Sequence, residues 1–154
     1  AREWKISCLS ILLNLENHIL SDYITVVEGD SVSPQTVDKV KSLIKPDEKV
    51  LLILDSNHSY DHVLKELHAY SPLVSEDSFI IVCDGIIIDL VGAPRSQPDW
   101  AENNPLMAAK NFSSKNPEFK VVDPEFLFNE SLVGKPPTYW KGGYLQRIGA
   151  KKAM

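Results

Sequence analysis

The sequence has 154 residues, of which 44% are hydrophobic and 24% are charged. This balance is typical of one soluble globular domain with enough apolar surface to form a core. The formal net charge of −5 argues against the broad basic field that binding to nucleic acid or to an anionic membrane requires. We therefore expect a single domain over residues 1–154, with neither nucleic acid nor a membrane as a partner.

The two cysteines, Cys8 and Cys83, lie far apart inside apolar runs. That pattern is typical of buried free thiols in a reducing compartment and not of a disulfide framework. It predicts a cytoplasmic protein.

The first apolar run, residues 6–15, is too short to span a bilayer and predicts a core strand or helix. Three further runs, at residues 23–30, 49–55 and 78–84, are rich in Ile, Val and Leu and each ends in an aspartate. Such runs, with little alternation, are typical of strands that are covered on both faces.

Helical patterns separate these predicted strands. Ser33 as N-cap and Pro34 at the first helical position begin one helix, and Val63, Leu64, Leu67 and Tyr70 mark the apolar face of the next. The alternation of strands and helices predicts an α/β fold with a doubly wound, mostly parallel sheet.

After the third strand the chain enters a predicted loop over residues 85–102, which contains Arg95, Asp99 and Trp100. This loop is either a lid over a site or a surface segment held by one buried tryptophan. A helix over residues 103–119 follows, then the strand "FKVV" and a closing strand "GGYLQRI".

Asp30, Asp55 and Asp84 all fall at the carboxyl ends of predicted parallel strands. Open α/β sheets bind ligands at this edge. An aspartate at a strand end is also common as a helix cap or turn residue, so both interpretations stay open for each position.

The segments "VVEGDSVSPQTVDKV", "ILDSNHSYDHVLKEL", "PDWAENNPLMAA" and "GGYLQRI" together resemble the cephalosporin hydroxylase and rhamnosyl O-methyltransferase family, from about Leu15 to Ile148. The resemblance implies a Rossmann-like methyltransferase fold that binds S-adenosylmethionine, with a Mg²⁺-like ion beside the methyl donor. Carried over by position, Gly29, Asp30 and Ser31 look like cofactor contacts on the adenine side. Asp55 looks like a metal ligand close to the cofactor.

Asp84, at the end of the next strand, could supply a second oxygen ligand to the ion. His58 follows Asp55 by three residues, where related catechol-type methyltransferases resemble this arrangement with a lysine base, so we predict that it accepts the substrate proton. Two alternatives stay open: His58 caps the following helix, or Asp55, His58 and His62 form a Zn²⁺ site.

The sequence also departs from the family pattern. Cys83 stands where many relatives carry an acidic residue, and thiols are poor Mg²⁺ ligands. The glycine-rich turn that cradles the methionine part of the cofactor has no counterpart, so the chain resembles the carboxyl-terminal two-thirds of a methyltransferase without its first strand. An open sheet edge and a bare apolar face would then favour a homo-oligomer.

Three functions follow from these observations. The first is a metal-assisted, S-adenosylmethionine-dependent O-methyltransferase that acts on a small hydroxylated molecule, such as a sugar or a secondary metabolite. The second is a non-catalytic or truncated methyltransferase-like interaction module. The third is a metal-dependent hydrolase or oxygenase that uses Asp55, His58 and His62.

Overall fold

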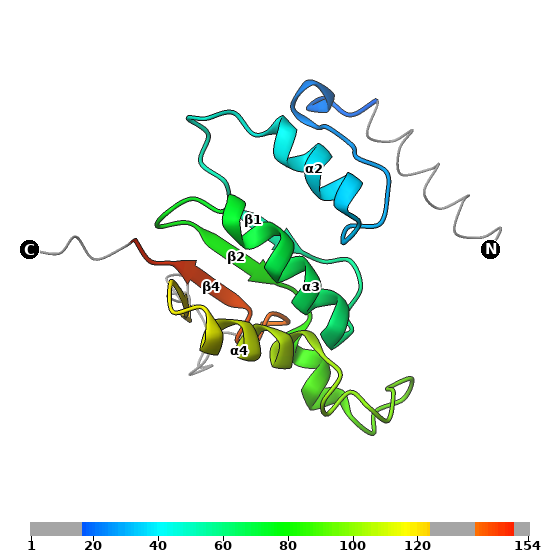
Figure 1. The fold of residues 1–154 in the computed structure, drawn as a ribbon. Coiled ribbons are helices and arrows are strands. Elements are labelled where there is room, and N and C mark those ends of the chain that lie inside the picture. The colour runs from blue at the N-terminus through cyan, green and yellow to red at the C-terminus, as the bar shows by residue number, and fades with distance from the viewer. Residues whose placement is uncertain (1–16, 124–137, 150–154) are drawn as a thin grey trace, which may run out of the picture. The chain divides into compact units, whose positions relative to one another are not determined.

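The computed structural model describes residues 17–123 and 138–149 (Figure 1). These residues fall into two units, the first ending at Asp30 and the second beginning at Ser31. The helices and strands are, in chain order, η1 (Ser21–Tyr23), α2 (Pro34–Leu43), β1 (Leu52–Leu54), α3 (Tyr60–Tyr70), η2 (Ser71–Leu73), β2 (Phe79–Val82), η3 (Gly85–Leu90), α4 (Pro105–Lys115), β3 (Phe119–Val121) and β4 (Tyr144–Arg147), where η is a 3₁₀ helix.

The described part of the first unit contains a short 3₁₀ turn and no strand. Ser21–Tyr23 forms η1, and residues 24–30 make no strand ladder with any described residue. The predicted strand over residues 23–30 is therefore wrong, because strand propensity produces a strand only where a neighbouring strand supplies the hydrogen bonds. The element predicted over residues 6–15 lies outside the described residues.

The second unit is built on a four-stranded mixed sheet with the strand order β1-β2-β4-β3. β1 pairs with β2 in parallel, whereas β4 pairs antiparallel with both β2 and β3. The prediction of a mostly parallel sheet is therefore wrong, since two of the three pairings are antiparallel. A buried apolar strand fits either direction, and the sequence does not reveal that β4 inserts between two strands that run the opposite way.

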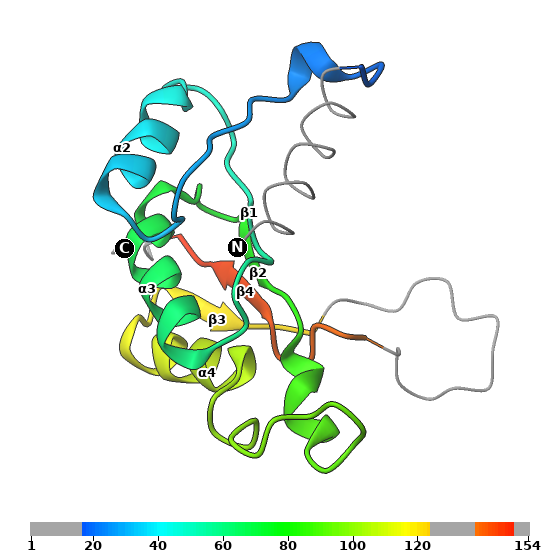
Figure 2. The ribbon, with the colours of Figure 1, turned by 90° about the vertical axis from the view of Figure 1, so that its right-hand side faces the viewer.

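Helices α3 and α4 pack against each other and cover one face of this sheet (Figures 1 and 2). The side chains of β2 alternate accordingly, with Ile80 and Val82 fully buried and Phe79 and Ile81 half-buried. Within the described ranges these two helices supply the main cover of the strands, and both lie on the same face. A doubly wound arrangement, with helices on both faces, is not confirmed.

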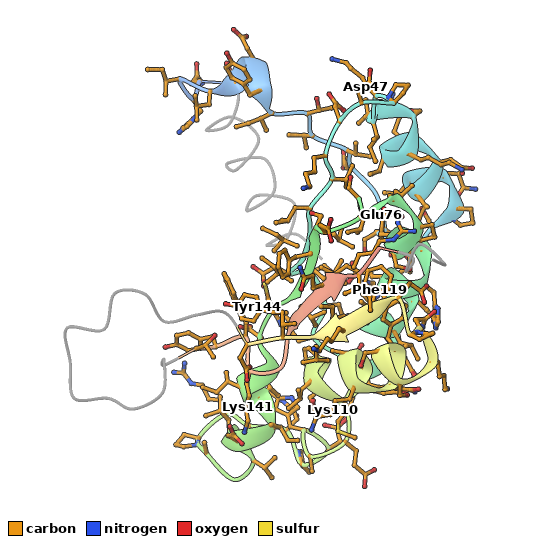
Figure 3. All side chains as sticks on the ribbon, turned by 90° about the vertical axis from the view of Figure 1, so that its left-hand side faces the viewer. Asp47, Glu76, Lys110, Phe119, Lys141 and Tyr144 are labelled. Atoms are coloured by element: carbon orange, nitrogen blue, oxygen red, sulfur yellow. The ribbon has the colours of Figure 1, made fainter. Side chains whose placement is uncertain are left out.

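The core lies between that face and the two helices. Phe119 of β3, labelled in Figure 3, packs against Phe112 of α4 with ring centroids 5.4 Å apart. The buried cluster consists of Leu54, Val63, Leu67, Val74, Ile80, Val82, Ala108, Ala109, Phe112, Phe119 and Leu145. None of the described helices is long and apolar enough to cross a membrane.

The helix starts follow the capping residues in the sequence. The Ser33 side chain accepts a hydrogen bond from the backbone N–H of Thr36, and Asn104 does the same for Met107. Each cap precedes a proline at the first helical position, where the missing N–H costs nothing. The predicted start of the helix at Pro34 is confirmed.

Two glycines allow β4 to approach the end of β2 closely. A Cβ atom on Gly143 would overlap the backbone carbonyl oxygen of Val82, and one on Gly85 would overlap that of Lys141. The Val82 N–H donates to the Gly143 carbonyl at 2.8 Å, so the turn before β4 is fixed against β2. This contact fixes the strand end from which Asp84 emerges.

Candidate functional site

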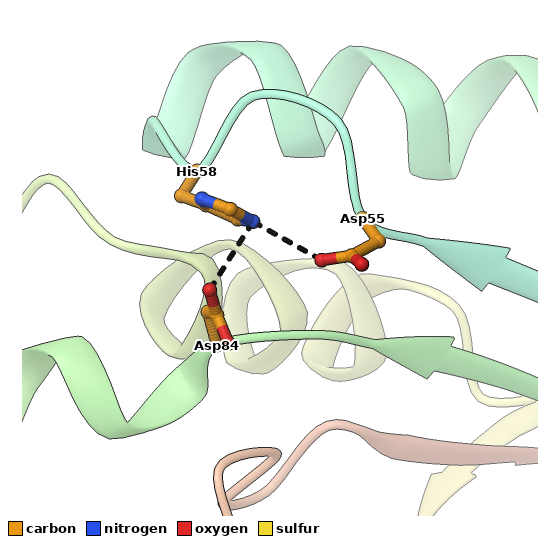
Figure 4. Close-up of side chains that lie close together, drawn as sticks. All are labelled: Asp55, His58 and Asp84. Carbon is orange, nitrogen blue, oxygen red and sulfur yellow. Dashed lines mark hydrogen bonds and ion pairs between the residues drawn. The ribbon is translucent and has the colours of Figure 1, made fainter. Parts of the chain in front are cut away.

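Asp55 and Asp84 follow neighbouring parallel strands and therefore emerge at the same edge of the sheet. Nε2 of His58, from the turn before α3, lies 3.4 Å from Oδ1 of Asp55 and 3.5 Å from Oδ2 of Asp84 (Figure 4). One ligand atom from each residue lies within 4.8 Å of the other two. The structure thus brings together the three residues for which the sequence predicts catalysis and metal binding.

The backbone around this cluster is fixed by local hydrogen bonds and one turn. Asp84 adopts the left-handed conformation, with φ of 56°, and this ends β2 and begins η3. Aspartate and asparagine tolerate this conformation better than most residues. The Ser59 N–H donates to Oδ1 of Asn57 within the turn that carries His58, and the Tyr60 N–H donates to Oδ1 of Asn103, which ties the carboxyl-terminal side of this turn to the segment before α4.

Cys83 lies beneath the cluster and is only 2% exposed. Burial raises the pKa of Cys83 to about 11, with further contributions from the negative charges of Asp55 and Asp84 and from the hydrogen bond with Asp55. A metal binds the thiolate form of cysteine. The neutral thiol donates to Asp55.

The two carboxylates of the cluster suit a hard divalent cation, because oxygen atoms are the ligands that Mg²⁺ and Ca²⁺ prefer. The imidazole nitrogen Nε2 of His58 lies 3.4 Å from Oδ1 of Asp55 and 3.5 Å from Oδ2 of Asp84, so it would lie beside an ion held by these two side chains. Asp55, His58 and Asp84 have side chains that are 65%, 34% and 38% exposed, which leaves room for water or substrate oxygens as further ligands.

A cavity of about 400 Å³ lies beside β1 and shares Asp55 with this cluster. Its lining is largely apolar, with a few polar side chains, and consists of Ser31, Val40, Leu52, Ile53, Leu54, Asp55, Ser56, Glu66 and Tyr70. Two of the predicted cofactor contacts, Ser31 and Asp55, therefore line one cavity. The roles of Gly29 and Asp30, which belong to the first unit, stay predictions.

Glu66 is a site residue that the sequence reasoning missed. Its side chain is 3% exposed, and Oε1 accepts a hydrogen bond of 2.7 Å from Ser56 Oγ. The signal was present in the sequence, because Glu66 lies three residues after Val63 and four before Tyr70 on the buried face of α3. An acidic side chain on the apolar face of a helix predicts a carboxylate that is buried and has polar partners.

His62 does not join the metal-ligand cluster. Its Nε2 lies 3.0 Å from Ser31 Oγ and 3.5 Å from Glu66 Oε1. His62 is a residue of α3 whose ring nitrogen is hydrogen-bonded to the Ser31 hydroxyl. The alternative Zn²⁺ site of Asp55, His58 and His62 loses its support, because the structure groups Asp84 and not His62 with the other two.

The predicted loop over residues 85–102 contains η3 and several turns. Asp99 accepts a hydrogen bond from the Asn103 amide, and the Trp100 carbonyl accepts one from Asn104. These bonds tie the end of the loop to the start of α4. A role as a lid stays a prediction.

Comparison with known proteins identifies the family. The family model of rhamnosyl O-methyltransferase/CmcI matches residues 13–148, which include every residue of the cluster and the cavity. Neither a curated protein nor a solved structure matches the chain. The match over most of the sequence agrees with the resemblance found in the segments around Asp55 and Asp84. The chain belongs to the rhamnosyl O-methyltransferase/CmcI family.

Proposed function

We propose that the site transfers a methyl group from S-adenosylmethionine to a hydroxyl group of a small molecule, such as a sugar or a secondary metabolite, with the help of a divalent cation such as Mg²⁺. The observation that carries the proposal is that Asp55 belongs both to the cluster and to the cavity. Its carboxylate belongs to the cluster with His58 and Asp84, and the residue also lines the cavity beside β1. A cofactor in the cavity and an ion in the cluster would therefore be neighbours. Family membership supports the same reaction.

Asp55 and Asp84 are the residues that would hold the ion. Carboxylate oxygens suit Mg²⁺, and both side chains begin at the ends of paired strands, which makes their backbone positions rigid. A bound divalent ion supplies positive charge that lowers the pKa of a substrate hydroxyl. S-adenosylmethionine, when bound, supplies the methyl group on a sulfonium.

His58 is placed to act as the base. Its Nε2 faces both carboxylates, and a side chain that is 34% exposed can be reached by a substrate hydroxyl. In the proposed reaction the hydroxyl proton passes to His58, the substrate oxygen forms the new bond to carbon, and the bond from sulfur to that carbon breaks. The two carboxylates then face a protonated imidazole. The residues otherwise contribute by holding the reactants in line, and such positioning accounts for much of the catalysis of bond-forming steps.

A direct test uses S-adenosylmethionine with an isotopically labelled methyl group. The full chain is incubated with the labelled cofactor, Mg²⁺ and a panel of sugars and phenols, and the products are followed by mass spectrometry. The proposal predicts a labelled O-methyl product whose formation stops when a chelator removes the ion and resumes when Mg²⁺ is restored.

Two outcomes would overturn the proposal. Transfer that continues in the presence of the chelator would reject metal assistance. A chain that neither binds the cofactor nor transfers the methyl group would reject the enzyme and favour the non-catalytic module.

A further inference from the structure

A short hydrogen bond ties the residue after Asp55 to the middle of α3. Ser56 Oγ donates to Oε1 of Glu66 at 2.7 Å, the most common length for a hydroxyl donor. On the other side of Asp55, the Leu54 carbonyl at the end of β1 accepts from the Cys83 N–H at 3.0 Å. Asp55 therefore lies between two fixed neighbours, one held by the sheet and one held by Glu66.

The need to satisfy Ser56 does not explain why a glutamate is buried here. Ser56 is an exposed residue, so water can serve as an acceptor for its hydroxyl. The Glu66 side chain is only 3% exposed, and its second oxygen, Oε2, is buried without a hydrogen-bond partner in the described part of the chain. Such an oxygen lowers stability. Proteins keep unfavourable groups of this kind mainly where the side chain serves a functional site.

Pairing within α3 does not explain Glu66 either. His62, one turn earlier in the helix, has its Nε2 3.5 Å from Oε1 of Glu66, whereas Ser56 Oγ lies 2.7 Å from the same oxygen. The histidine lies closer to Ser31, with 3.0 Å between Nε2 and Oγ. The contact with Ser56 is therefore the closer one, and it connects α3 to the segment that carries the candidate metal ligand.

We propose that Glu66 is a positioning residue that, through Ser56, fixes the orientation of the Asp55 carboxylate. In that orientation Asp55 faces the other two members of the cluster, His58 and Asp84 (Figure 4). The inference rests on the proposed function, because the ion that the two aspartates would hold is part of it. A ligand that is held in place before binding loses less freedom when the ion arrives. Groups that orient a metal ligand in this way contribute about 10- to 100-fold to metal affinity.

The test measures the affinity of the full chain for Mn²⁺ by electron paramagnetic resonance. Ser56→Ala removes the donor, and Glu66→Met removes the acceptor while it keeps a long, flexible side chain. Each variant should bind Mn²⁺ about 10- to 100-fold more weakly than the wild-type chain. The double variant should lose no more than either single variant, because both changes remove the same hydrogen bond.

Two further variants serve as controls. Glu66→Gln keeps an oxygen that can accept from Ser56, so its Mn²⁺ affinity should stay within about threefold of wild type. If the negative charge of Glu66 attracted the ion directly, Glu66→Gln would lose as much affinity as Glu66→Met. Ser59→Ala is the matched control for Ser56→Ala, because Ser59 lies in the same segment and its side chain makes no capping hydrogen bond. It should bind Mn²⁺ like the wild-type chain.

Thermal unfolding without metal separates a positioning role from a purely structural one. Glu66→Met removes the buried oxygen that lacks a donor, so its unfolding temperature should equal or exceed that of the wild-type chain while its Mn²⁺ affinity falls. A lower unfolding temperature in Glu66→Met, together with normal Mn²⁺ binding in Ser56→Ala, would assign Glu66 a structural role. If Glu66→Met does not fold, Ser56→Ala and Glu66→Gln still decide the inference.

Failure of the inference differs from failure of the proposed function. Wild-type Mn²⁺ affinity in a folded Ser56→Ala chain, additive losses in the double variant, or equal losses in Glu66→Gln and Glu66→Met would overturn the role of Glu66. Each of these results leaves a wild-type chain that binds the ion, so the proposed metal site stands. A wild-type chain that binds no Mn²⁺ would instead reject the metal site itself, and with it both proposals.

Discussion

Nε2 of His58 lies 3.4 Å from Oδ1 of Asp55, and the same aspartate lines the cavity beside β1. Asp55, a candidate metal ligand, therefore lies beside both a candidate proton acceptor and a candidate cofactor cavity. This arrangement depends on the parallel pairing of β1 with β2, which places Asp55 and Asp84 at the same edge of the sheet.

Asp84→Asn should weaken metal binding at least about tenfold, because it replaces a charged oxygen ligand by a neutral amide. Asparagine tolerates the left-handed backbone of residue 84, so the substitution tests the charge and not the turn. The control is Asp89→Asn, which removes an exposed carboxylate in η3 that pairs with Lys141. Titration with Mn²⁺, followed by electron paramagnetic resonance, measures both. Equal affinities in the two variants would contradict a metal site at Asp84.

His58→Ala should lower turnover by about 10²- to 10⁴-fold, the usual contribution of a positioned acid or base. The affinities for cofactor and for metal should change little, because the proposed role of His58 is to accept the substrate proton. His18→Ala, which removes an exposed histidine from the first unit, is the control. A parallel loss of Mn²⁺ affinity in His58→Ala would instead identify the imidazole as a ligand.

Cys83 should make the protein less stable as the pH rises from about 9 to 11. Its pKa is raised from 9.0 to about 11 in the folded chain, so the unfolded chain loses the thiol proton first and alkali favours unfolding. The stability present below pH 9 should fall by up to about 2 to 3 kcal/mol by pH 11. Chemical denaturation at pH 8.5 and 10.5 measures this change. The Cys83→Ala variant measures the loss of stability that other titrating groups cause. An equal loss of stability in that variant would refute the assignment of the effect to Cys83.

Self-association through the open edge of β1 is a further prediction. Among the described residues β1 pairs with β2 alone. Leu51, just before β1, and Ile53, within β1, are 50% and 54% exposed. We expect a homo-oligomer that Ile53→Lys converts to a smaller species in light scattering, since a charged edge opposes strand pairing. Val121→Lys, at the opposite edge strand, should have no effect. Loss of the oligomer in Val121→Lys alone would place the interface at β3.

The sequence predicts local features of this fold well. Ser33 with Pro34, and the cap-type residues before Pro105, mark helix starts because capping involves only a few neighbouring residues. Asp55 and Asp84 were predicted to lie close because each directly follows an apolar run that forms a strand.

Features that depend on distant pairing could not be predicted in the same way. The direction of β4 depends on the strands that it joins, and residues 23–30 have the composition of a strand but form no ladder with any described residue. Glu66 carries a visible signal on the apolar stripe of α3, but only the surrounding atoms show that one of its oxygens has no hydrogen-bond partner in the described part of the chain.

The most direct test of the central claim is a calorimetric titration of S-adenosylmethionine, with Mg²⁺ present, into the wild-type chain and into Asp55→Asn. Asp47→Asn, an exposed carboxylate in the loop before β1 that is labelled in Figure 3, serves as the control. We predict that the wild-type and control chains bind the cofactor and Mg²⁺, and that Asp55→Asn weakens both at least about tenfold. Wild-type protein that does not bind the cofactor, or an Asp55→Asn chain that binds both as tightly as wild type, would contradict the account.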